Sequence, residues 1–96
     1  LNGNAEIIST DDSSHSWITT LYSNTNTSGQ NVFQRARGTQ STPLALQTND
    51  TIGNFSFRGY DGTAFTGSQA YINSGASENW TATATGTFID FRTTAN

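Results

Sequence analysis

The chain has 96 residues, a formal net charge of −3 and no cysteine, so it forms one small domain at most, without disulfides, catalytic thiolates or cysteine-bound zinc. Lys is absent and Arg occurs four times, which argues against binding to nucleic acid or to anionic membrane surfaces. No apolar run is long enough to be inserted in a membrane.

The polar residues are unusual in kind, since the chain holds 17 Thr, 11 Ser and 10 Asn. Thr is β-branched and fits pleated surfaces, whereas Asn, Ser and Gly favour tight turns. This composition predicts an all-β fold with strands joined by tight turns. Leu, Ile, Val and Phe number only 17, so much of the core area must come from the 11 aromatic residues. The shortfall indicates that each chain buries apolar surface against other copies.

Three strands are expected in the first third of the chain, at residues 5–9, 16–22 and 31–37. Polar loops separate them at residues 10–14 and 23–30. Trp17 and Ile18 fall on opposite faces of the second strand, and Phe33 and Arg35 share a face of the third.

Residues 38–43 read as a connector, residues 44–47 as a short strand and residues 48–50 as a turn. Pro43 has no N–H to donate, which places it at the edge or start of a strand.

The strongest strand pattern covers residues 51–58. Strict alternation places Ile52, Asn54, Ser56 and Arg58 on one face, and Gly53, Phe55 and Phe57 on the other. Gly59-Tyr60-Asp61-Gly62 is the sharpest turn signal, because Asp-Gly favours positive φ. With Phe65 after it, this turn is expected to set the register of an interior hairpin.

A further strand is expected at residues 68–73, with Ala70 and Ile72 pointing inward, followed by a loop at 75–80. The last strand covers residues 86–93, where Phe88, Asp90 and Arg92 alternate with Thr87, Ile89 and Phe91.

The stretch from Arg37 to Thr94 resembles a region of trimeric phage tail fibres and related fibre tips. The elements that carry the resemblance are Arg37-Gly38-Thr39, Pro43, Asp50, Ile52-Gly53, residues 57–65 (FRGYDGTAF), Ala70-Tyr71-Ile72, residues 78–81 (ENWT) and residues 86–94 (GTFIDFRTT). The combination of Gly-Tyr-Asp-Gly with the closing Phe-Arg-Thr-Thr is moderately specific.

The resemblance implies a β-rich homotrimer whose strands are either interleaved or packed around a threefold axis. It also implies a location outside the cell, on a virion or a bacterial surface. Such segments usually precede a self-cleaving intramolecular chaperone domain, so the chain, which begins at Leu1 and ends at Asn96, is expected to be part of a longer protein. Residues 1–96 form one fibre module in this interpretation. Residues 37–94 carry the fibre motif, and residues 1–34 are a candidate variable portion that bears specificity.

Candidate chemistry is sparse, and no catalytic residue, metal site or cofactor is predicted. His15 follows Asp11 and Asp12, but neighbours on an extended chain point to alternate sides, so a solvated loop is the better interpretation. Asp61, Glu78 and Asp90 are the carboxylates near aromatic residues that a glycosidase pair would need. Asp61 is better explained as a turn former and Asp90 as the partner of an Arg on its own strand face.

The four Arg residues could recognise acidic sugars, but we favour a structural role for Arg35, Arg37, Arg58 and Arg92. They would pair with Asp50, Asp61, Asp90 or backbone carbonyls, including across a trimer axis.

Exposed aromatic rings are the candidate ligand site, since they stack on sugar rings while Asn, Asp and Gln read the hydroxyl groups. The candidates are Trp17, Tyr22, Tyr60 and Trp80, of which Trp17 and Trp80 flank polar loops. We therefore expect a receptor-binding or shaft module of an adhesive fibre that recognises cell-surface glycans. A purely structural spacer and a fragment of a polysaccharide depolymerase are the alternatives.

Overall fold

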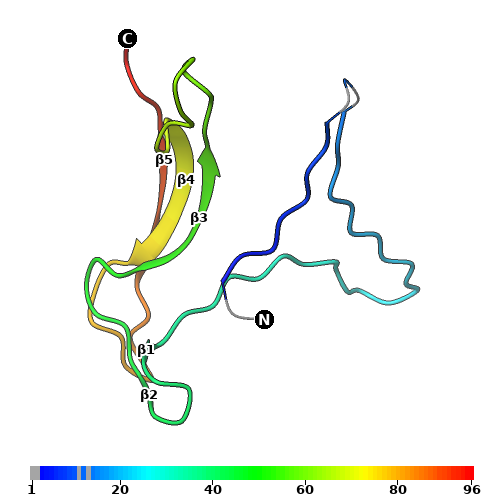
Figure 1. The fold of residues 1–96 in the computed structure, drawn as a ribbon. Helices are drawn as coiled ribbons and strands as arrows, with labels where there is room; N and C mark the ends of the chain where they lie inside the picture. The colour runs from blue at the N-terminus through cyan, green and yellow to red at the C-terminus, as the bar shows by residue number, and fades with distance from the viewer. Residues whose placement is uncertain (1–2, 11, 13) are drawn as a thin grey trace. The chain divides into compact units, whose positions relative to one another are not determined.

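The computed structural model describes residues 3–10, 12 and 14–96, and the chain divides into two compact units, Leu1–Asn31 and Val32–Asn96. All regular structure in the described part of the chain is β-strand, and every pairing is antiparallel, as Figure 1 shows for the second unit. The predicted all-β fold class is therefore confirmed. No helix in the described residues is long and apolar enough to cross a membrane.

A three-stranded sheet dominates the second unit. It consists of β3 (Thr51–Phe57), β4 (Ala70–Ala76) and β5 (Thr87–Arg92), in the order β3-β4-β5. These strands confirm the three predicted from alternation over the second half of the chain. β4 continues into the predicted 75–80 loop, because Gly75 has no side chain. A Cβ there would lie 2.6 Å from both the Asp50 carbonyl oxygen and the Phe88 ring.

A small two-stranded ladder lies beyond one end of the sheet (Figure 1), formed by β1 (Arg37–Gly38) and β2 (Pro43–Leu44). Pro43 begins β2, as its missing N–H predicts. The predicted strand at 44–47 is wrong beyond Leu44. Leu46 turns inward instead, and its carbonyl oxygen accepts the backbone N–H of Trp80 at 2.9 Å.

The core of the second unit sits at this end of the sheet and is very small. Leu46 (3% exposed) and Ala76 (0% exposed) are the only apolar side chains classed as buried in the described residues. Backbone hydrogen bonds surround them, from Asn49 N–H to the Ala76 carbonyl (2.8 Å) and from Ser77 N–H to the Gly86 carbonyl (3.0 Å). Burial of this extent cannot offset the conformational entropy of ordering a domain.

A β-bulge at the start of β3 changes which face Ile52 occupies. Thr51 pairs with Gly75 and Gly53 pairs with Ser74, so Ile52 is the additional residue. The two residues of a bulge oppose one partner and point to the same side of the sheet. Strict alternation therefore placed Ile52 wrongly, since it shares a face with Gly53 and Phe55.

The turn predicted at residues 59–62 forms two residues later, at 61–64, with Gly62 at φ 100°. Tyr60 pairs with Phe65, and the Asp61 N–H donates to the Ala64 carbonyl oxygen at 3.0 Å. Asp61 shapes the turn through its side chain, because Oδ1 accepts the backbone N–H groups of Thr63 (2.8 Å) and Ala64 (2.9 Å). These bonds hold the pKa of the Asp61 carboxyl below its usual value. The hairpin is not interior, however, since Phe65 is exposed and packs edge-to-face on Tyr60.

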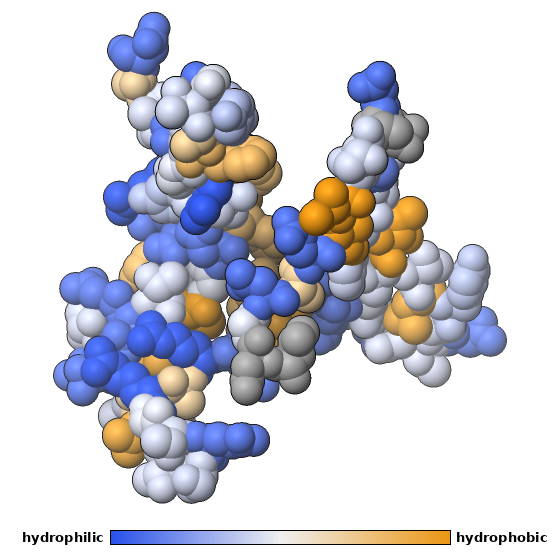
Figure 2. Space-filling view, in the orientation of Figure 1, coloured by the Kyte–Doolittle hydropathy of each residue, from blue (hydrophilic) through white to orange (hydrophobic). Residues whose placement is uncertain are grey.

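The first unit contains no strand ladder among its described residues, so the predicted strands at 5–9 and 16–22 are wrong for the single chain, and 31–37 contributes only Arg37 to β1. Apolar residues there stand side by side, as in Ile7-Ile8 and Trp17-Ile18, and all four are exposed. Both faces of such a segment are apolar, so one sheet layer cannot bury them. Hydrophobic residues are accordingly visible at the surface of each unit, in patches among hydrophilic ones (Figure 2). The predicted loop at 10–14 includes Asp11 and Ser13, which lie outside the described residues.

Gly62→Val should lower the free energy of unfolding by about 1–2 kcal/mol, because a β-branched residue at positive φ is strained. Nothing lies within 4 Å of a Cβ added at Gly62, so the effect isolates backbone strain. Gly59→Val is the matched control, since Gly59 has equal space and no positive φ. Urea denaturation measures both, and equal effects of the two substitutions would contradict the assignment.

Candidate functional site

One face of the β3–β4–β5 sheet is apolar. Directly opposed residues of antiparallel strands point to the same side. The register therefore aligns two rows, one of Phe55, Ile72 and Phe91 and the next of Gly53, Ser74 and Ile89. With Phe57 on β3, the bulge residue Ile52 and Phe33 from the preceding segment, these form a surface that we call the apolar face. Its members are Phe33, Ile52, Phe55, Phe57, Ile72, Ile89 and Phe91.

The apolar face is open to solvent. Phe55, Phe57 and Ile89 each keep more than half of their surface exposed, and Phe91 keeps 78%. Exposed apolar surfaces of this kind are typical of interaction sites.

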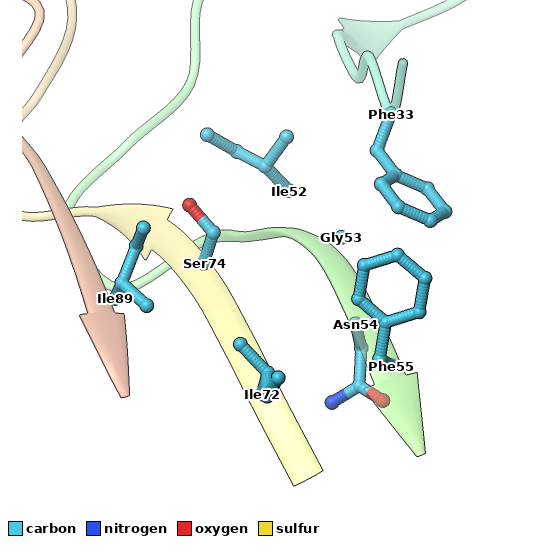
Figure 3. Close-up of a pocket in the computed structure, with 8 residues that line it drawn as sticks. All are labelled: Phe33, Ile52, Gly53, Asn54, Phe55, Ile72, Ser74 and Ile89. Atoms are coloured by element: carbon cyan, nitrogen blue, oxygen red, sulfur yellow. The ribbon is translucent and has the colours of Figure 1, made fainter. Parts of the chain in front are cut away.

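A hollow of about 250 Å³ lies in the apolar face, as Figure 3 shows. Gly53, which has no side chain, and the small Ser74 leave space within it, and the rings of Phe33 and Phe55 stand together over β3. These two rings meet edge-to-face with centroids 5.2 Å apart. Gly53 is essential for this arrangement, since a Cβ there would lie 2.7 Å from the Phe33 Cβ and Cγ atoms.

The segment that carries Phe33, residues 32–37, is held on the start of β3 by two arginines, and we call it the strap. Arg35 donates from Nη1 to the Thr51 carbonyl oxygen at 2.6 Å. Arg37 forms a bidentate pair with the Asp50 carboxylate, with Nε–Oδ2 at 2.5 Å and Nη2–Oδ1 at 2.7 Å. Phe33 and Arg35 were predicted to share one face of their segment, and the side chains of both contact β3.

Asp50 is the electrostatic centre of this arrangement. Its side chain is buried and also accepts the backbone N–H of Gln47 at 2.9 Å. The Arg37 hydrogen bonds, and then the Gln47 hydrogen bond, hold the pKa of Asp50 far below its usual range, and the charge of Arg35 acts in the same direction. The sequence named Asp50 as an Arg partner, but bidentate pairing with Arg37 was not predictable from it.

The opposite face of the sheet is polar. It carries Asn54, Ser56, Tyr71, Asn73, Asp90 and Arg92, together with Phe88. Arg92 binds Asp90 at 3.1 Å on the same strand face, as predicted, and its guanidinium lies 5.9 Å from the Tyr71 ring centroid. The two faces therefore differ in kind, since one is mostly apolar and the other is mostly polar.

The four predicted ligand-binding aromatics are divided between the two units. Trp17 (77% exposed) and Tyr22 (92% exposed) belong to the first unit. Tyr60 and Trp80 belong to the second, in the turn after β3 and in the segment after β4, which are opposite ends of the sheet (Figure 1). Tyr60 donates its hydroxyl to the Thr63 carbonyl at 3.1 Å, and half-buried Trp80 donates Nε1–H to the Gly86 carbonyl at 2.9 Å.

Trp17 lies beside uncharged hydrogen-bonding groups. It lines a shallow, mostly polar depression with Thr19, Leu21 and residues 27–31 (TSGQN). Tyr22 does not line this depression, because alternate residues of the extended chain point to opposite sides.

The carboxylates near aromatic residues are each engaged locally. Asp61 caps its own turn, Asp90 pairs with Arg92, and Glu78 accepts the Gly86 N–H at 2.7 Å. Within residues 3–10, 12 and 14–96, no group of three or more His, Asp or Glu side chains comes together, and Asp11 lies outside that range.

Stability should fall as the pH drops below about 4, because the folded pKa of Asp50 lies below the unfolded value of about 3.9. The unfolded chain then binds the proton more readily, whereas above about pH 5 this group adds no pH dependence. Asp50→Asn should remove most of the slope, and Asp90→Asn, in the exposed pair, should keep it. Melting temperatures from pH 2 to 7 at one protein concentration measure this, and an unchanged slope in Asp50→Asn would contradict it.

Comparison with known proteins leaves the relationship to trimeric fibres as a prediction. The chain matches no protein-family model, and no curated protein is significantly similar to it. The function is therefore argued from the apolar face and the exposed aromatic side chains.

Proposed function

We propose that the chain is a module of a homotrimeric adhesive fibre, carried outside the cell on a virion or bacterial surface, which recognises cell-surface glycans. The observation that carries the proposal is the exposed apolar face on a chain with almost no core of its own. Such a face is stable in water only when another layer covers it.

Copies of the same chain are the simplest cover. Removing apolar surface from water stabilises a protein by about 25 cal/mol per Å². Burial of several large side chains between copies therefore adds a favourable free energy to each chain that a single exposed sheet does not have. The face carries no charged member, and its hydroxyl and amide groups are few, so packing against an equivalent surface leaves no buried ion unpaired. The number of copies, three, rests on the resemblance of residues 37–94 to trimeric fibre segments.

Glycan recognition is supported by exposed aromatic rings among Thr, Ser, Asn and Gln side chains. Trp17, with the depression it lines, is the best candidate, and Tyr22 and Tyr60 are also exposed. Trp80 is a weaker candidate than its sequence context indicates, because its indole N–H is used within the fold.

A structural spacer is the second candidate function. It is favoured by the internal hydrogen bonds of Tyr60 and Trp80, which give these rings a role without a ligand. The local engagement of Asp61, Glu78 and Asp90 gives a depolymerase no comparable support.

The oligomeric state tests the first part of the proposal. We expect sedimentation equilibrium at micromolar concentration to give the mass of three chains. Ile89→Asp should raise the dissociation constant at least about 30-fold, which corresponds to about 2 kcal/mol for an interface hot spot. Ser56→Asp adds the same charge on the polar face and should leave the trimer intact. A folded wild-type monomer, or equal effects of both substitutions, would overturn the assembly.

Glycan binding tests the second part. Trp17→Ala should weaken binding at least about tenfold, or about 1.4 kcal/mol, without lowering the melting temperature, because Trp17 is exposed. Ile18→Ala is the matched control, since Ile18 is equally exposed on the other side of the extended chain. Glycan arrays followed by titration calorimetry measure this, and a wild-type trimer that binds no glycan would favour the spacer.

A further inference from the structure

The apolar face presents two different patches, a projecting ring and a hollow. On the β5 side, Phe91 stands on an edge strand and is the most exposed member of the face, at 78%. On the β3 side, the strap adds Phe33 beside Phe55, and these rings wall the hollow (Figure 3). The face thus offers a projecting ring at the β5 edge and a cavity that extends from the Phe33 and Phe55 rings to Ile89.

The hollow suits one aromatic side chain better than a free ligand. Its volume of about 250 Å³ is below the roughly 300–1,000 Å³ of ordinary ligand pockets. Ile52, Ile72 and Ile89 line it, the small residues Gly53 and Ser74 leave room within it, and no charged residue takes part. An uncharged apolar ring therefore fits its chemistry.

The two patches decide which symmetry the contact takes. A twofold contact joins a patch to itself, so it would set Phe91 against Phe91 or hollow against hollow. A head-to-tail contact instead joins unlike patches, and it closes into a ring when the rotation between copies permits.

We infer that Phe91 of each copy inserts into the hollow of the next copy, between its Phe33–Phe55 wall and its Ile89, and that three such contacts close a ring. The inference rests on the proposed trimer and names the contact that builds it. Phe91 is a projecting residue and the strap is a positioning element, because Arg35 and Arg37 fix Phe33 at the hollow.

Disulfide trapping tests the contact, and the cysteine-free chain makes it selective. Ile52→Cys and Phe91→Cys in one chain lie on β3 and β5, two strand spacings or about 10 Å apart, which is too far for a bridge within the chain. Mild oxidation of the assembled protein should therefore link copies, with a ladder that ends at three chains on a non-reducing gel. Each variant with a single cysteine should give no disulfide-linked trimer on the gel. The double variant Ser56→Cys and Asp90→Cys, on the polar face, should give no link between copies.

The outcomes separate this inference from the proposed function. The protein could sediment as a trimer and yet form disulfide links between copies only in the single variant Phe91→Cys. Like residues would then meet at the axis, which would overturn the inference but keep the trimer. A ladder that continues beyond three chains would replace the ring by an open filament. A monomer by sedimentation would overturn the proposed function as well.

Complementary large-to-small and small-to-large substitutions test the same contact if the cysteine variants do not assemble. Phe91→Ala removes the projecting ring and Ser74→Phe fills the hollow, and each alone should raise the trimer dissociation constant at least about tenfold. Together they should recover most of that loss, because the new ring at Ser74 takes the space that Phe91 leaves in the next copy. Additive losses in the double variant would overturn the inference.

Discussion

The second unit depends on the ion pair and hydrogen bonds that the Asp50 carboxylate forms. This carboxylate joins the strap, through Arg37, to the turn before β3, through the Gln47 N–H. The backbone carbonyl of the same residue accepts the N–H of Ala76, where β4 ends. Three segments that are distant in sequence therefore converge on one residue. A charged group serves this purpose here because the apolar side chains nearby are too few to fix the segments by packing alone.

This polar junction leaves the apolar side chains of the sheet for another use. A domain of ordinary composition buries the apolar side of a sheet beneath a second layer of its own chain. Here the strap covers only the region over Gly53, and Phe91 and Ile89 have no such cover from the described residues of their unit. The second unit is accordingly held together at one end of the sheet by hydrogen bonds and ion pairs, while most of the apolar face stays exposed.

Alternation predicted the sheet well because each of its strands is polar on one side and apolar on the other. β3, β4 and β5 lie within a few residues of their predicted bounds, and the side-chain pattern of β5 is as expected. Ile52 was misplaced because a bulge adds a residue that period-two counting cannot detect. The strands expected at 5–9 and 16–22 do not form, since β propensity gives no information about a ladder partner. Of the site, the aromatic candidates could be named, but the hollow depends on the approach of Phe33 to Gly53 across 20 residues of chain.

The exposed apolar face also has a kinetic consequence. When folding is completed only by contact with two other copies, its rate depends on how often three chains meet, and dilute chains spend longer in states that aggregate. Joining the chains elsewhere along a longer protein would replace the bulk concentration by an effective concentration in the millimolar range. If the proposed trimer forms, an added domain that holds three chains together should therefore speed the covering of this apolar face.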